Sequence, residues 1–127
     1  MSNLTFGQFL RKVRQSKNIT GRSLAEHLKM SPPYISEVER GGRPPLYYDK
    51  LVEIKNFLNL DKGETETLMN LAGRGRNEIA PDLVEYIVEH PEVNDFIRLA
   101  RDEMWTSTDW LELLKQLKND QIHSSFD

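Results

Sequence analysis

Apolar residues recur at helical spacing along most of this chain, in short runs separated by capping residues, glycines and prolines. The first run follows the i, i+3, i+4, i+7 pattern that puts apolar side chains on one face of a helix: Phe6, Phe9, Leu10 and Val13. Thr5 and Gln8 form a capping-box pattern at its start. Since no alternating run is long enough to predict a strand, the sequence predicts an all-α chain.

Start and stop signals divide the chain into about eight helices, five of them before residue 73. Ser31 is a good helix cap ahead of Pro32, and the glycines at 41 and 42 suit a helix end. Two glycines, at 73 and 75, flank an arginine and indicate a hinge. We therefore expect four parts: a domain over residues 1–72, a hinge over 73–80, a helical region over 81–120, and a disordered tail over 121–127.

The net charge of −3 is the sum of two halves of opposite sign. Residues 1–60 hold ten Lys and Arg against five Asp and Glu, a net charge of +5, whereas residues 61–127 carry −8. The whole-chain isoelectric point near 5.6 argues against a nucleic-acid partner, but the basic N-terminal part is compatible with one.

Several classes of protein are disfavoured by composition. The chain has no cysteine, which excludes disulfides, thiolate metal sites and a cysteine nucleophile, and fits a reducing compartment. No apolar run reaches the roughly 20 residues of a membrane helix, and the first residues do not resemble a secretory signal. We expect a cytoplasmic protein.

Residues 20–45 carry the strongest functional signal, because two short helices joined by a three- to four-residue turn match a helix-turn-helix unit. This stretch closely resembles the Cro/CI-type (XRE) helix-turn-helix family at ten patterned positions: Thr20, Leu24, Ala25, Met30, Ser31, Ile35, Ser36, Val38, Glu39 and Gly41. The resemblance implies a five-helix, lambda-repressor-like DNA-binding domain, followed here by a short C-terminal helical extension. It also implies a transcriptional regulator, most often a repressor, that binds a pseudo-palindromic operator as a homodimer.

The resemblance assigns roles to individual residues. The residues expected to read bases are Pro32, Pro33, Ser36 and Glu37. The residues expected to contact phosphates are Arg14, Arg22, Ser31, Tyr34, Arg40 and Arg43. Arg14 and Glu39 also occupy positions that the family often joins by an ion pair, which would orient the first and third helices.

Two departures from the family pattern change what can be expected of DNA recognition. The glutamine that usually opens the second helix is Gly21 here, so we assign its phosphate contact to Arg22 or to the free N–H groups of that helix start. Pro32 and Pro33 replace a polar pair, and their rings offer only apolar contacts, for example to a thymine methyl group. Direct readout therefore depends on Glu37, with Ser36, Arg40 or Tyr34.

Candidate catalytic and metal-binding groups are scattered. His27, His90 and His123 lie far apart, and none has a partner at the spacing of a metal motif. The glycine-rich stretch at 73–76 lacks the Gly-Lys-[Ser/Thr] ending of a phosphate-binding loop. We expect no metal, no cofactor and no enzymatic activity.

The C-terminal helices are amphipathic but too few to enclose a core of their own, so their apolar side chains require a partner surface. A second copy of the chain would supply it if these residues form a dimer interface: Phe96, Trp105, Trp110, Leu113, Leu114 and Leu117. Intramolecular packing is the alternative. Two other functions stay open: an antitoxin that represses its own operon and binds a toxin through these helices, and a protein-interaction adaptor that does not bind DNA.

Overall fold

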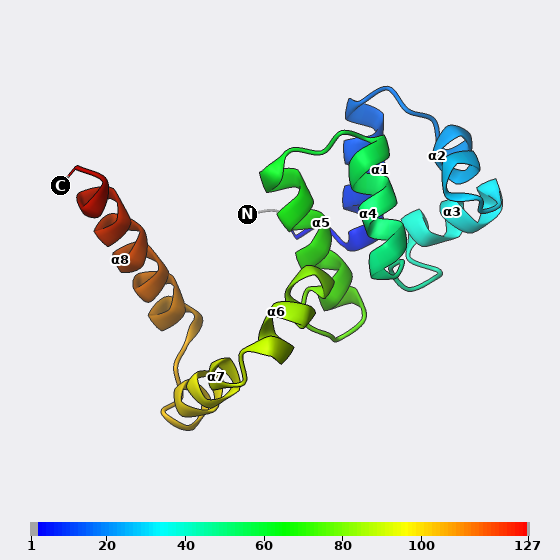
Figure 1. The fold of residues 1–127 in the computed structure, drawn as a ribbon. Helices are drawn as coiled ribbons and strands as arrows, with labels where there is room; N and C mark the ends of the chain where they lie inside the picture. The colour runs from blue at the N-terminus through cyan, green and yellow to red at the C-terminus, as the bar shows by residue number, and fades with distance from the viewer. Residues whose placement is uncertain (1–2, 127) are drawn as a thin grey trace. The chain divides into compact units, whose positions relative to one another are not determined.

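The computed structural model of the chain describes residues 3–126, with the main chain alone for 122–126, and it is all-helical over that range. The contacts divide the chain into two compact units, Met1–Glu85 and Tyr86–Asp127 (Figure 1). The elements, in order, are α1 (Phe6–Ser16), α2 (Gly21–Leu28), α3 (Pro32–Arg40), α4 (Tyr48–Phe57), α5 (Lys62–Gly75), the 3-10 helix η1 (Pro81–Leu83), α6 (Val84–Glu89), α7 (Glu92–Asp102) and α8 (Ser107–Phe126). The all-α prediction is confirmed.

Side-chain caps begin four of the first five helices, and two of these caps, Thr5 and Ser31, are predicted above from the sequence. Thr5 and Asp61 each form a complete capping box, with Gln8 and Glu64 respectively. Thr20 accepts a hydrogen bond from the N–H of Ser23, and Ser31 accepts one from the N–H of Tyr34. Each cap satisfies a main-chain donor that has no partner within the helix, which fixes where the helix begins.

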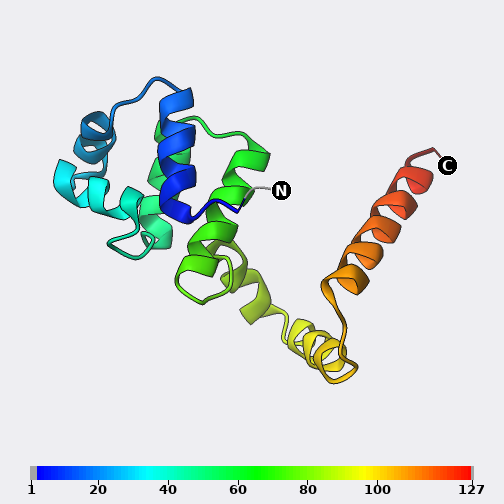
Figure 2. The ribbon, with the colours of Figure 1, turned by 180° about the vertical axis from the view of Figure 1, so that it is seen from behind.

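One apolar core holds the first unit together. It is built from buried side chains of the first five helices and of the loops between them: Phe6, Leu10, Val13, Leu24, Ala25, Leu28, Ile35, Val38, Leu46, Leu51, Ile54, Leu58, Leu60, Leu68, Met69 and Ala72. α3 packs against both α1 and α2 at one end of the unit (Figures 1 and 2). The contact with α1 is close, since a Cβ on Gly7 would lie 2.4 Å from the carbonyl oxygen of Val38.

The segment that we expected to be a hinge, 73–80, is packed against the first unit. α5 continues to Gly75, and the N–H of Glu78 donates to the carbonyl oxygen of Gly73 as the chain turns back. A Cβ on Gly73 would lie 2.7 Å from the nitrogen of Ala80, so this glycine permits a close approach of two main-chain segments. The first unit accordingly continues to Glu85 and includes η1 and the start of α6.

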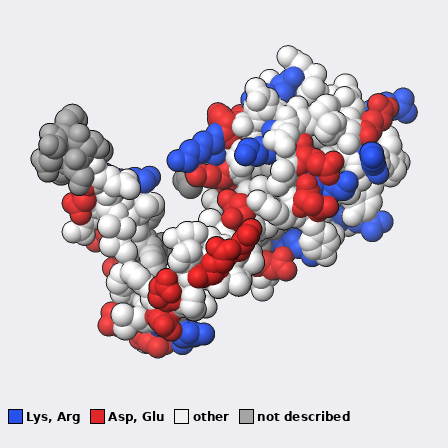
Figure 3. Space-filling view, viewed as in Figure 1, with Lys and Arg blue, Asp and Glu red and all other residues white. Residues whose placement is uncertain are grey.

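The second unit buries little of its apolar surface. Of its described side chains only Ala100 is buried. Phe96, Trp105 and Trp110 form an aromatic cluster with ring centroids 4.9–5.9 Å apart. In the view of Figure 3, acidic side chains gather over α6 and α7. Most of the expected tail, residues 122–127, lies outside the residues whose side chains are described.

No helix within the described part of the chain is long and apolar enough to cross a membrane.

Candidate nucleic-acid interface

α2 and α3 form a helix-turn-helix unit with a three-residue turn, Lys29 to Ser31. Lys29 ends α2 in the left-handed conformation, with φ of 59°, and the N–H of Met30 donates to the carbonyl oxygen of Ala25. Ser31 then caps α3, and Pro32 occupies the first helical position, where its missing N–H leaves no hydrogen bond unmade. The turn and the buried faces of both helices therefore hold α3 with its outward face exposed.

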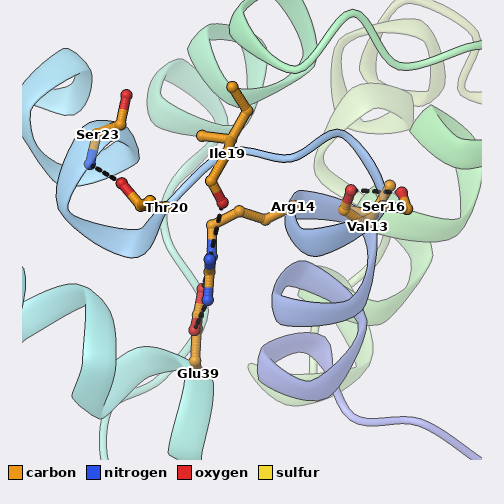
Figure 4. Close-up of polar contacts among 7 residues, drawn as sticks. All are labelled: Val13, Arg14, Ser16, Ile19, Thr20, Ser23 and Glu39. Carbon is orange, nitrogen blue, oxygen red and sulfur yellow. Dashed lines mark hydrogen bonds and ion pairs between the residues drawn. The ribbon is translucent and has the colours of Figure 1, made fainter.

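Arg14 joins α1 to α3 and to the loop that precedes α2 (Figure 4). Its Nε and one terminal nitrogen donate to the two carboxylate oxygens of Glu39 at 2.8 and 2.9 Å, and the other terminal nitrogen donates to the carbonyl oxygen of Ile19 at 2.8 Å. The side chains are only 10% and 8% exposed. Because the guanidinium is largely covered and all three of its nitrogens are engaged within the protein, its clearest role is to fix the orientation of α3.

The outward face of α3 carries two exposed prolines and a small network of polar side chains. Pro32 and Pro33 are exposed. Arg40 donates to the hydroxyl of Ser36 at 2.8 Å and forms an ion pair with Glu37. The Arg40 guanidinium therefore lies over the preceding turn of α3, among the residues expected to read bases, so Ser36, Glu37 and Arg40 act as one group.

The residues expected to contact phosphates surround this face. Arg22 and Arg43 are exposed, and the Arg43 guanidinium lies 5.1 Å from the ring centroid of Tyr34. Tyr34 is half-buried, with its ring packed against the core. The Ser31 oxygen accepts the helix-capping hydrogen bond, which leaves the hydroxyl hydrogen free to donate.

A crevice between α1, α2 and α3 adds one basic residue that the sequence analysis missed. Arg11 lines this crevice together with Arg14, Arg22 and Arg40. Arg11 is exposed and precedes Arg14 by three positions, so the two residues share one side of α1. That spacing was the signal that could have identified it.

The two tyrosines at the start of α4 both lie at the surface. Tyr47 and Tyr48 are 67% and 48% exposed, and Leu46 is buried next to them. The Tyr47 ring stacks instead on the Arg76 guanidinium, 4.0 Å from its centroid, and Arg76 also donates to the carbonyl oxygen of Pro45. These contacts hold the loop after α3 against the end of α5.

The six residues expected at a dimer interface all belong to the second unit. Phe96, Leu114 and Leu117 are about half exposed, at 48%, 49% and 54%. Trp110 is 39% exposed, and Trp105 and Leu113 are partly buried. The structure thus gathers three of the six residues in the aromatic cluster. The leucines of α8 continue this apolar surface along the helix.

No group of three or more potential metal ligands occurs among the described residues. His27 stacks on Phe57 and His90 on Tyr86, with centroids 4.1 and 4.2 Å apart. The side chain of His123 lies outside the described residues.

Comparison with known proteins agrees with this geometry. A family model described as a helix-turn-helix domain matches residues 5–81. Two curated relatives are the uncharacterized HTH-type transcriptional regulators MT0491 and Rv0474 of Mycobacterium tuberculosis, strains CDC 1551 / Oshkosh and ATCC 25618 / H37Rv. Each is 33% identical over 120 residues, which is 94% of this chain and 70% of the relative.

A solved structure, that of the clp gene regulator ClgR from Corynebacterium glutamicum, is 24% identical with a TM-score of 0.44. The match covers 77% of this chain and 88% of that one.

The chain belongs to the helix-turn-helix family of transcriptional regulators. It is a DNA-binding transcriptional regulator, and the α2–α3 unit is the part of the fold that such proteins place on DNA.

Proposed function

We propose that the protein is a cytoplasmic, non-enzymatic repressor that binds a pseudo-palindromic operator as a homodimer. The observation that carries this proposal is the exposed outward face of α3, held by the Arg14–Glu39 pair and bordered by Arg22, Arg40 and Arg43. A helix held in this way can enter the major groove and block a promoter by occupying it.

DNA recognition divides into two groups of contacts. The α3 face formed by Pro32, Pro33, Ser36 and Glu37 reads base edges, and the Arg40 guanidinium lies within reach of the same base pairs. Phosphate contacts by Arg22, Ser31, Tyr34 and Arg43 fix the register of the helix on the duplex but carry no sequence information. Arg14 contributes by holding α3 through Glu39.

Dimerisation is assigned to the second unit. Two copies of α3 must lie about one DNA turn, about 34–36 Å, apart to read two half-sites. The exposed apolar side chains of α7 and α8, centred on the aromatic cluster, supply a self-complementary surface for this purpose. The acidic character of this unit favours its orientation away from the phosphates.

Selection of bound sequences from random duplexes, followed by a salt titration on the selected site, tests the proposal. We expect a palindromic consensus and an association constant that falls steeply with salt, by about 0.9 logarithmic units per decade for each neutralised phosphate. No duplex binding at about 50 mM salt, where phosphate contacts are strongest, would rule out the DNA-binding function. Transcription from the selected site, measured with and without the protein, distinguishes repression from activation.

A further inference from the structure

A groove of about 800 Å³ lies between α1 and α5 of the first unit, away from the crevice beside α3. Its apolar lining comes from Leu4, Phe9, Val13 and Leu71. Phe9 and Leu71 are only partly buried and pack against the core from this side. The groove shares no lining residue with the crevice formed by α1, α2 and α3.

Some polar groups of the groove already have hydrogen-bond or ion-pair partners within the protein, and others do not. The Ser16 hydroxyl donates to the carbonyl oxygen of Val13, and the Thr67 hydroxyl donates to that of Gly63. Lys17 and Glu64 form an ion pair at 3.2 Å, so the one carboxylate of the lining is neutralised. The two hydroxyl groups and the Glu64 carboxylate therefore have partners within the protein. The electrostatic potential of the groove depends on the remaining charged side chains.

Two of those side chains are cations without an acidic partner. Lys12 of α1 and Arg74 of α5 both line the groove, and the side chain of neither has an ion pair or hydrogen bond with another described residue. A flexible ammonium group and a guanidinium beside an apolar floor attract a ligand that carries a negative charge on an apolar body.

The dimensions of the groove suit a small molecule. The lining of α5 runs from Glu64 to Arg74, about 15 Å along the helix axis. The volume lies within the range of about 300–1,000 Å³ that is usual for small-molecule sites.

We propose that this groove binds an amphipathic organic anion of the acyl-carboxylate type. The apolar chain lies on Leu4, Phe9, Val13 and Leu71, and the carboxylate accepts hydrogen bonds from Lys12 or Arg74. The site does not depend on the DNA-binding proposal, because it uses neither α2 nor α3.

Titration of the full chain with decanoate, followed by amide chemical shifts in nuclear magnetic resonance, tests this inference. We expect shift changes in α1 and α5, and weaker binding of decanol, which lacks the charge. The double variant Lys12→Gln, Arg74→Gln should bind decanoate at least about tenfold more weakly. Thr67→Glu, which adds a carboxylate on an exposed position of the lining, should also weaken binding.

Lys115→Gln, Lys118→Gln removes two cations from α8 and serves as the matched control, with an expected change of less than about twofold. Thermal unfolding of each variant verifies that its fold is intact. The inference is overturned if shift changes are confined to α7 and α8, which would place decanoate on the exposed apolar surface of the second unit. It is equally overturned if the Lys12, Arg74 variant binds decanoate normally but loses affinity and salt dependence toward duplex DNA, because the two cations would then be phosphate contacts.

Discussion

Arg14 and Glu39 are joined by two hydrogen bonds of 2.8 and 2.9 Å between side chains that are about one-tenth exposed or less. They lie 25 residues apart and tie α1 to the last turn of α3. A pair covered to this extent contributes mainly by fixing geometry, since the loss of water by both ions offsets much of their attraction.

Removal of one member of this pair is expected to destabilise the first unit strongly. Glu39→Ala leaves the Arg14 charge covered and without its carboxylate, which should lower the free energy of unfolding by about 3 kcal/mol or more. Urea denaturation followed by circular dichroism measures this change. The exposed pair Arg98–Asp95 is the control, and Asp95→Ala should change stability by less than about 0.5 kcal/mol. Equal effects from the two substitutions would contradict a structural role for Glu39.

Gly7→Ala is expected to push α3 away from α1. The added Cβ would meet the carbonyl oxygens of Val38 and Glu39 at 2.4 and 2.5 Å, and main-chain atoms cannot rotate aside. We expect a loss of about 1–3 kcal/mol in the free energy of unfolding, together with weaker DNA binding. Gly63→Ala is the matched control, because its Cβ would meet only the Asp61 carboxylate at 3.6 Å. Because Gly63 lies in a helix, Gly63→Ala should raise the free energy of unfolding by up to about 1 kcal/mol, measured by thermal or urea unfolding.

Much of the fold could be predicted because the helix starts are encoded locally. Thr5, Thr20, Ser31 and Asp61 each cap a helix through a side chain within three residues of its partner. The helical spacing likewise identified the apolar face of α1, where Phe6, Leu10 and Val13 are buried. Short-range signals of this kind need no knowledge of the tertiary structure.

The structure differs from the predictions where side-chain orientation and contacts outside a single helix decide the arrangement. Gly73 suggested flexibility, whereas it permits the close approach of Ala80, which follows it by seven residues. Tyr47 suits a buried helix face by spacing, yet Arg76 holds its ring at the surface. The grouping of Arg40 with Ser36 and Glu37 also depended on side-chain orientation, which spacing alone does not determine.

Substitutions on and beside α3 should separate base readout from phosphate contact. Arg40→Ala and Glu37→Ala are both expected to relax sequence preference at the same base position, because the Arg40 guanidinium and the Glu37 carboxylate are paired. Arg43→Ala should weaken binding to all duplexes alike and reduce the slope of the salt dependence by about one unit. Selection of bound sequences and salt titration measure the two effects. If Arg40→Ala instead weakens binding to all duplexes equally and leaves the sequence preference unchanged, Arg40 is a phosphate contact.

Charge placed on the apolar surface of α8 is expected to produce a monomer. Leu114 and Leu117 lie three residues apart on one face of the helix and are about half exposed. Leu114→Asp, Leu117→Asp would bury two carboxylates without partners if this face meets a second copy, a change that strongly disfavours association. Light scattering coupled to gel filtration measures the mass of the particle. Gln116→Asp, an exposed position between them in sequence but on a different face, should leave the dimer intact.

Operator affinity should fall with the loss of the dimer, because one protomer can contact only one half-site at a time. A double variant that stays dimeric and binds its operator normally would move the interface away from α8.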